Sequence, residues 1–160
     1  MNIPLPALDC MCASFRRSAR ALTQLYDEAL RPLGLRVTQF TILQALERTG
    51  EVTQGLLGEV LVMDSTSLSR TLKIMTGHGW VAERRGEDRR ERRLRLSPAG
   101  VRQLKRALAV WEEAQARLRR RIGEGTWNQL MRTANEVARI AVDTTNESAA
   151  GRGGPTRPDR

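Results

Sequence analysis

The chain has 160 residues, 40% of them hydrophobic, and carries a formal net charge of +9. Its length and apolar content suffice for a folded core, and its charge favours a polyanionic partner, either nucleic acid or an anionic membrane surface. No apolar run approaches the roughly 20 residues of a membrane span, the N-terminus lacks a secretory signal pattern, and two cysteines are too few for a disulfide scaffold, so the sequence predicts a cytoplasmic protein.

The first predicted element is an amphipathic helix over residues 8–31. Apolar side chains recur there at steps of three and four, and Pro32 and Gly34 follow its end. The apolar stripe consists of Leu8, Cys12, Phe15, Ala19, Leu22, Tyr26 and Ala29.

Two shorter helices are predicted next. The first has Thr38 as its N-cap and ends at Gly50, and its expected buried positions are Phe40, Leu43, Ala45 and Leu46. The second has Thr53 as its N-cap, and its expected inward positions are Leu56, Leu57, Val60 and Leu61.

A fourth helix begins after a turn at Met63 and Asp64, and it has two distinct faces. Leu68, Leu72 and Met75 share the apolar face, whereas the opposite face carries Thr66, Ser69, Arg70, Lys73 and Gly77. No carboxylate occurs between Ser65 and Gly79. Because a merely solvated helix face usually mixes both signs of charge, this face is suited to an anionic surface; a Ser/Thr-rich surface helix is the alternative.

A basic β-hairpin follows this helix. Trp80 and Val81 on one strand, and Leu94 and Leu96 on the other, form its apolar side, with the turn centred on residues 86–88. Residues 83–95 hold seven arginines and four carboxylates, a net charge of +3. This excess favours a nucleic-acid contact over the alternative, a salt-bridged surface turn.

Two long helices complete the predicted fold. Ser97 is the expected N-cap of the first, with Pro98 at its first position, and its apolar stripe continues to Ile122. The second begins near Thr126. Residues 147–160 have almost no apolar content and are predicted to form a disordered tail.

Three short helices followed by a basic hairpin predict a winged helix-turn-helix, in a chain that is mainly α-helical with a small β-hairpin wing. A helix fits the major groove of a DNA duplex, and a hairpin beside it reaches the backbone or the minor groove. On this basis Ser65, Thr66, Ser67, Ser69, Arg70, Lys73, Arg84, Asp88, Arg89, Arg90 and Arg92 are the predicted DNA-binding residues.

At this point the chain resembles the MarR (multiple antibiotic resistance regulator) family of bacterial transcription factors. The resemblance rests on "VTQFTILQAL", "STSLSRTLKIMTGHGWV" and "GEDRRERRLRLSPAG", the last of which matches the family's Asp-x-Arg wing. It implies a homodimer that binds a pseudopalindromic duplex and usually represses genes until a small ligand or an oxidant releases it. It also implies that Asp88 braces Arg90, which enters the minor groove. Gly77, His78 and Gly79 depart from the family pattern, so a looser end of the recognition helix is expected.

The domain organisation predicted from these elements has four parts. Residues 1–34 form an N-terminal dimerisation helix, 35–97 the winged helix-turn-helix, 98–146 the C-terminal dimerisation helices, and 147–160 the tail. The apolar stripes of the first and last helices are longer than the winged module can cover, which independently favours a symmetric dimer. Packing into a monomeric helical lid is the alternative.

The sequence offers two routes by which the protein could sense a signal. Arg16, Arg17 and Arg20 are candidate ligands for the carboxylate of a small anionic or aromatic effector bound between the dimer helices and the winged module; surface or partner contacts are the alternative. The second route is a redox switch at Cys10 and Cys12. On a helix, Cys12 lies on the apolar stripe and Cys10 about 200° away. We therefore expect Cys12 in the core, and Cys10 as an outward thiol close to Arg16 or Arg17 that can act as a sensor.

Other classes of function fit less well. One histidine and no phosphate-binding glycine loop argue against an enzyme, a metal site or a cofactor. An architectural DNA-binding protein without a sensing role remains an alternative. An RNA-binding winged helix is disfavoured because aromatic residues are only 4% of the chain and the tryptophans lie on apolar stripes.

Overall fold

The computed structural model describes residues 6, 9–86 and 91–150 of the chain. Its elements in chain order are α1 (Met11–Leu30), a 3-10 turn (Arg31–Leu33), α2 (Val37–Thr49), β1 (Val52–Thr53), α3 (Gln54–Leu61), α4 (Ser65–Gly77), β2 (Val81–Arg85), β3 (Arg92–Leu96), α5 (Pro98–Ile122) and α6 (Glu124–Ala150). The mainly α-helical fold with a hairpin wing is confirmed. Contacts group the chain into two compact units, Met1–Ala114 and Gln115–Arg160.

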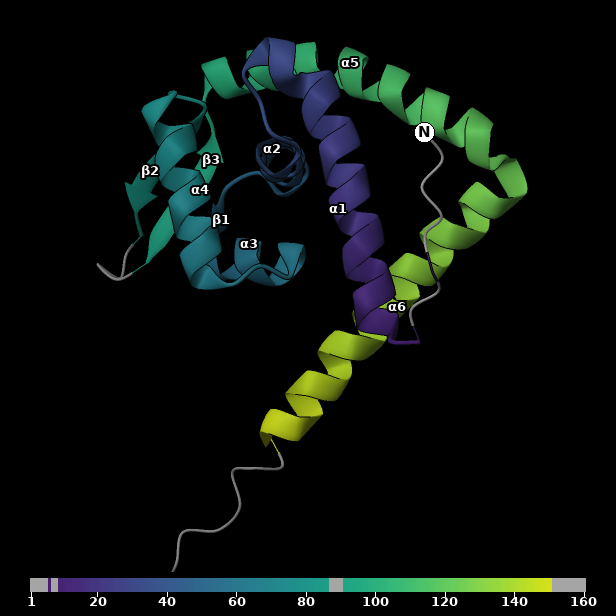
Figure 1. The fold of residues 1–160 in the computed structure, drawn as a ribbon. Coiled ribbons are helices and arrows are strands. Elements are labelled where there is room, and N and C mark those ends of the chain that lie inside the picture. Colours follow the sequence, from purple (N-terminus) through teal and green to yellow (C-terminus); the bar gives the residue numbers. More distant parts are fainter. Residues whose placement is uncertain (1–5, 7–8, 87–90, 151–160) are drawn as a thin grey trace, which may run out of the picture. The chain divides into compact units, whose positions relative to one another are not determined.

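Helix α2 lies in the middle of the first unit. Figure 1 shows it almost end-on, with α1 on one side and α4 with the sheet on the other. Its inward residues include Phe40, Leu43, Ala45 and Leu46, as predicted, together with Ile42 and Gln39, which were not predicted. Phe40 also meets Trp111 of α5, with ring centroids 5.6 Å apart.

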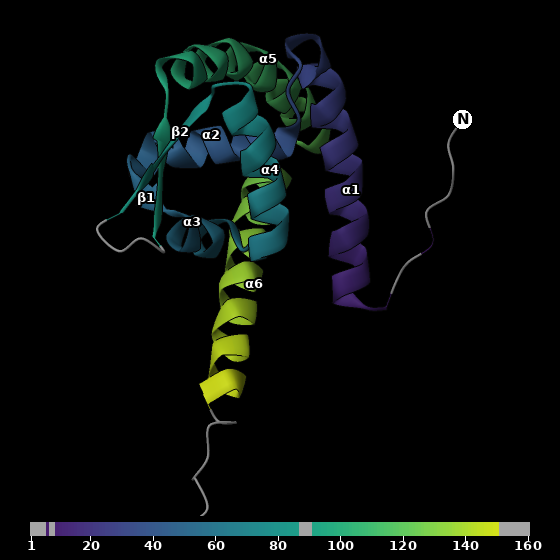
Figure 2. The same ribbon diagram turned by 90° about the vertical axis from the view of Figure 1, so that its left-hand side faces the viewer.

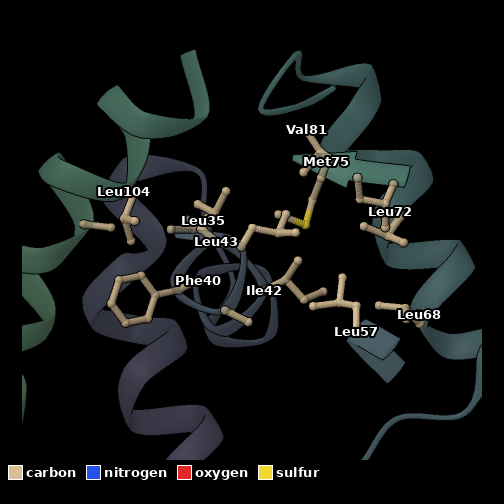
Figure 3. Packing of buried hydrophobic residues seen from close by; sticks show 14 of the residues in the cluster. Leu35, Phe40, Ile42, Leu43, Leu57, Leu68, Leu72, Met75, Val81 and Leu104 are labelled. Carbon is tan, nitrogen blue, oxygen red and sulfur yellow. The ribbon is translucent and has the colours of Figure 1, made fainter. Parts of the chain in front are cut away.

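The core of this unit joins all three helices of the helix-turn-helix to the sheet. Figure 3 shows Met75 of α4 lying beside Leu43 of α2 and Val81 of β2, and Leu57 of α3 lying near Leu68 of α4. Each of these five side chains is almost fully buried. Helix α4 is therefore held in place along its whole inner face.

The hairpin belongs to a three-stranded antiparallel sheet with the order β1-β3-β2. Val81 pairs with Leu96 and Glu83 with Leu94, in agreement with the predicted hairpin. The third strand, β1, was not predicted; its Val52 pairs with Leu94. Figure 2 shows the sheet, α3 and α4 after a 90° turn.

Several predicted helix boundaries need correction. Helix α1 begins at Met11 rather than Leu8, and α2 has Arg36 rather than Thr38 as its N-cap. The earlier start of α2 has a physical cause. The Val37 N–H donates to Asp27 Oδ1 (2.7 Å), and the Arg36 N–H donates to Gln39 Oε1 (2.9 Å). The N–H groups at the start of the helix, which have no partner within the helix, therefore find acceptors before Thr38 is reached.

The other predicted caps agree with the structure. Thr53 Oγ1 accepts from the Leu56 N–H (3.1 Å), and Ser97 Oγ accepts from the Gly100 N–H (3.0 Å). Leu56 and Val60, however, are 48% and 53% exposed, because the eight residues of α3 turn only one row, that of Leu57, toward the core.

The second unit contains the end of α5 and all of α6. Helix α6 continues to Ala150, so residues 147–150, predicted as the beginning of a disordered tail, are helical. Residues 151–160, the remainder of that prediction, lie outside the described residues.

Candidate nucleic-acid interface

Helix α4 begins at a well-formed N-cap. The side chain of Asp64 accepts a hydrogen bond from the Ser67 N–H (2.8 Å), and this bond lowers the pKa of the Asp64 carboxyl group. The first turn contains no acidic residue. Ser65, Thr66 and Ser67 are exposed, and their hydroxyl groups lie at the positive end of the helix dipole. This end of the helix favours a negatively charged partner.

The two predicted faces of α4 are present. Leu68, Leu72 and Met75 are buried, whereas the outward face, consisting of Thr66, Ser69, Arg70, Lys73 and Gly77, is exposed. Ile74, which was not singled out from the sequence, is also 53% exposed. Within the described residues, neither Arg70 nor Lys73 has a salt bridge to a carboxylate.

The end of α4 is closed despite its two glycines. Gly79 has a left-handed φ of 70°, its N–H donates to Thr76 O (2.9 Å), and the Trp80 N–H donates to Met75 O (2.9 Å). The His78 ring stacks on Trp80 with centroids 4.5 Å apart. The looser helix end expected from the sequence is not found.

One side chain from α3 reaches the outward face of α4. Gln54, the first residue of α3, donates from Nε2 to Ser69 Oγ (2.7 Å). This bond leaves the Ser69 hydroxyl proton to be donated elsewhere. Gln54 was not predicted as a functional residue, since its partner lies on a different helix.

Three arginines of the wing strands, Arg84, Arg92 and Arg93, have carboxylate partners. Arg84 of β2 donates to both carboxylate oxygens of Glu51, from Nε to Oε2 (2.8 Å) and from Nη2 to Oε1. Arg92 Nε lies 3.3 Å from Glu83 Oε1, and Arg93 Nη2 lies 3.0 Å from Glu91 Oε1. The structure thus places Arg84 and Arg92, both predicted DNA contacts, in ion pairs on the strands.

Glu51 has an unusual electrostatic environment for a residue in a loop. Its hydrogen bond to Arg84 lowers the pKa of its carboxyl group, and the charges of Arg84, Arg93 and Arg95 lower it further. Sequence reasoning missed Glu51, because the pairing of β1 with β3 that brings it to the wing leaves no periodic signal in a two-residue strand.

Asp88, Arg89 and Arg90, the predicted tip of the wing, lie outside the described residues. The Asp88–Arg90 brace therefore stays a prediction.

A groove opens on the first unit between α1, α2 and the segment that precedes α4. Its volume is about 430 Å³, and its lining is Leu22, Thr23, Tyr26, Val37, Thr38, Thr41, Leu61 and Met63. Burial raises the pKa of the Tyr26 hydroxyl. The lining is apolar and hydroxylic, with no charged side chain.

The candidate arginines for effector binding do not line this groove. Arg16 and Arg20 are exposed on α1, and Arg17 Nη1 donates to Pro6 O (2.8 Å). They lie on the N-terminal side of the α1 residues that do line it.

Both cysteines are exposed in the chain, so the prediction that Cys12 is a core residue is wrong. The first turns of α1 have no core of their own chain beneath them; the only buried residue of α1 is Leu30. Cys10 is the N-cap, with an extended backbone (φ −92°, ψ 117°). The predicted angle of about 200° between the two cysteine side chains assumes that both residues are helical, so it does not apply.

Among the described residues, none of the helices has an apolar stretch of the length that a membrane span requires. The same part of the chain contains no group of three or more His, Cys, Asp or Glu side chains placed to hold a metal ion.

Comparisons with known proteins agree with this geometry. A MarR family model matches residues 33–93. YwoH, an uncharacterized HTH-type transcriptional regulator of Bacillus subtilis, is 36% identical over 76 residues, which are 48% of this chain and 56% of YwoH. The match therefore spans about half the length of that relative.

Solved structures give the same result over more of the chain. The M. tuberculosis transcriptional regulator MosR, solved in complex with DNA, superposes with a TM-score of 0.77 at 32% identity, covering 85% of this chain and 98% of MosR. Apo MarR of E. coli has the same fold, with a TM-score of 0.65 at 19% identity, covering 82% of this chain and 98% of MarR. The fold, the helix-turn-helix with its wing and these similarities together show that the chain belongs to the MarR family of transcriptional regulators.

Proposed function

We propose that the protein is a sequence-specific double-stranded DNA-binding regulator, most simply a repressor, that acts in the cytoplasm as a homodimer and is released from DNA by a small effector. The observation that carries this proposal is the outward face of α4, where hydroxyl groups and two cations stand on a helix that has no acidic residue from Ser65 to Gly77. A non-enzymatic role is consistent with the family.

The chemistry of α4 suits a duplex at close range. Ser65, Thr66, Ser67 and Ser69 supply short hydroxyl groups that hydrogen bond to phosphates or base edges, and Arg70 and Lys73 supply cations. That the similar protein MosR was solved in complex with DNA supports the same use of the fold here. Arg92 and the wing-tip residues Arg89 and Arg90 are proposed to contact the backbone or the minor groove beside α4, with Asp88 bracing Arg90.

Homodimer formation is supported by apolar side chains that the chain itself leaves uncovered. Met11, Phe15, Leu22 and Leu25 of α1 are 38–63% exposed, and Leu130, Met131, Ile140 and Val142 of α6 are 36–52% exposed. Surfaces of this kind mark interfaces, and two copies can bury them in a symmetric contact. The α4 helix of one copy would then bind one half of a pseudopalindromic site, and the α4 helix of the other copy would bind the other half.

Footprinting tests the proposal. The purified protein is applied to DNA flanking its own gene, and affinity is measured against salt concentration for the protected duplex and for a scrambled duplex of the same length. We expect a symmetric protected site, a preference for it over the scrambled duplex, and a steep loss of both affinities with salt. A chain that is monomeric by light scattering, or that binds both duplexes equally, contradicts the proposal.

The groove between α1, α2 and residues 61–63 is the proposed effector site. Its apolar and hydroxylic lining suits an uncharged aromatic ligand with hydrogen-bonding groups better than the anionic ligand expected from Arg16, Arg17 and Arg20. A ligand there contacts Met63, the residue directly before the N-cap of α4. Binding can therefore alter the position of the recognition helix.

A variant that fills the groove tests this site. Thr41→Met adds an unbranched side chain at the lining and should abolish release from DNA by candidate aromatic effectors, while DNA binding without effector is retained. Thr49→Met, at the end of the same helix and outside the groove, is the control. Equal release from both variants would place the effector elsewhere.

Thiol-based redox sensing is the second candidate, because the thiol of Cys10, the N-cap residue of α1, is exposed. In that case peroxide, rather than a groove ligand, releases the protein from DNA. Cys10→Ser should abolish that release. Release that persists in Cys10→Ser rules out this thiol, and a protein released by neither peroxide nor any ligand fits the architectural alternative.

A further inference from the structure

Glu51 lies at the point where the sheet meets the helix-turn-helix. It directly precedes β1, whose Val52 and Thr53 pair with Leu94 and Arg93 of β3. Thr53 is also the N-cap of α3. A single short segment, residues 51–54, is therefore shared by the wing sheet and by α3.

Both ends of this segment make side-chain contacts with the elements proposed to touch DNA. At one end, Glu51 accepts two hydrogen bonds from Arg84 of β2, and its Oε1 lies 4.0 Å from Arg93 Nη1 of β3. At the other end, Gln54 donates to Ser69 of α4 (2.7 Å). The segment thus connects the base of the wing to the recognition helix.

The position of Arg84 and Arg93 makes the carboxylate of Glu51 important. They are directly paired residues of the hairpin, so two guanidinium groups stand side by side. The Glu51 side chain is 26% exposed, whereas Arg84 is 58% exposed and Arg93 38%. Arg93 also pairs with Glu91 (3.0 Å), so Arg84 is the arginine that depends most on Glu51. Without the Glu51 carboxylate, the base of the wing carries one more net positive charge and attracts any phosphate more strongly.

We propose that Glu51 is a specificity-determining positioning residue, which holds Arg84 in an ion pair with two hydrogen bonds and so fixes the wing relative to α4, while its charge weakens non-specific phosphate contacts at the base of the wing. This inference rests on the proposed DNA-binding function. It reassigns Arg84 from a direct DNA contact to an ion pair. Non-specific binding depends almost entirely on phosphate contacts, whereas specific binding also needs the correct placement of α4. A residue that weakens phosphate contacts and fixes α4 relative to the wing therefore raises the affinity for the specific duplex relative to the affinity for other duplexes.

The test uses Glu51→Gln in the full-length chain, with binding to the footprinted duplex and to its scrambled counterpart measured between 50 and 200 mM salt. One additional phosphate contact made by Arg84 should steepen the log–log salt slope for the scrambled duplex by about 0.9, so that its affinity falls roughly 3.5-fold further over this range. At low salt the Glu51→Gln variant should bind the scrambled duplex more tightly than the wild type does. The preference for the footprinted duplex should fall.

Glu47→Gln is the matched control, because Glu47 is an exposed residue of α2 and its substitution changes the net charge equally. No ion pair involving Glu47 is found among the described residues. It should leave the slope and the preference nearly unchanged. Adding Arg84→Gln to Glu51→Gln should restore most of the wild-type slope.

The outcomes separate the possibilities. A Glu51→Gln protein that loses affinity for both duplexes by the same factor with an unchanged slope has lost only structural support, and the inference is overturned. The same holds if Glu51→Gln and Glu47→Gln behave alike. If the wild type itself binds no duplex, the proposed function fails first, and that result is visible before any variant is made.

Discussion

Gly100 of α5 lies directly against the backbone of Trp80. A Cβ at position 100 would stand 2.0 Å from the Trp80 carbonyl oxygen, and that same oxygen accepts a hydrogen bond from the Ser97 N–H (3.0 Å). The first turn of α5 therefore packs onto Trp80, the residue that directly precedes β2. Only a residue without a side chain fits this contact.

Gly100→Ala should be destabilising by about 1–3 kcal/mol, because the added methyl group meets backbone atoms that cannot rotate away. Urea unfolding measures the change. Gly125→Ala is the matched control, since Gly125 lies in the first turn of α6 with nothing within 4 Å of its Cβ position. The control should be neutral or slightly stabilising. Equal effects at both positions would mean that the Trp80 contact relaxes freely.

Two adjacent leucines of α3 should respond very differently to truncation. Leu57 is fully buried and Leu56 is 48% exposed. Leu57→Ala removes packing against the core and should cost about 2–5 kcal/mol, whereas Leu56→Ala should change stability by less than about 1 kcal/mol. Thermal and urea denaturation of the two variants check this. A reversed order would place Leu56 in the core and Leu57 outside it.

The N-cap of α4 should depend on pH in the acid range. The pKa of Asp64 is lowered in the folded protein, so its stabilising effect is complete above the unfolded value, about 3.9, and is lost as the pH falls through the lower folded value. Asn is a good neutral N-cap. The stability difference between the wild type and Asp64→Asn should therefore shift in favour of the variant as pH falls below about 4. A difference that is independent of pH from 3 to 6 would contradict the assigned cap.

Arg70 is the cation expected to matter most for sequence preference. If it contacts a base edge, Arg70→Ala should weaken binding to the footprinted duplex by about 1–3 kcal/mol and relax the preference at one position of each half-site. Fluorescence anisotropy with single-base variants of the duplex measures both effects. Arg132→Ala, which removes an exposed arginine from α6, should leave the preference intact.

Local chemistry made much of the fold predictable. The caps at Thr53 and Ser97 depend on residues within one turn, and the inner face of α4 follows from helical spacing, so both could be inferred from the sequence. The family could be inferred as well, because the recognition helix and the wing carry its characteristic residues.

The errors in the sequence-based predictions occur where contacts with a distant part of the chain determine the local structure. Helix α2 starts at Val37 because the carboxylate of Asp27, on α1, satisfies its first N–H. Strand β1 exists because Val52 meets Leu94. Cys12 lies on an apolar stripe, but no part of the described chain covers it. The roles of Glu51 and Gln54 were missed for the same reason, since their partners Arg84 and Ser69 are brought near only by the fold.

The strand order β1-β3-β2 also bears on how the chain acquires its structure. The central strand is the last of the three in the sequence, so during synthesis the sheet stays open until residues 92–96 have emerged. Helices form from neighbouring residues within microseconds, whereas closure of the long loop between Val52 and Leu94 carries a larger entropic cost. Refolding kinetics should therefore show early helix formation, with docking of the central strand as the slow, rate-limiting event.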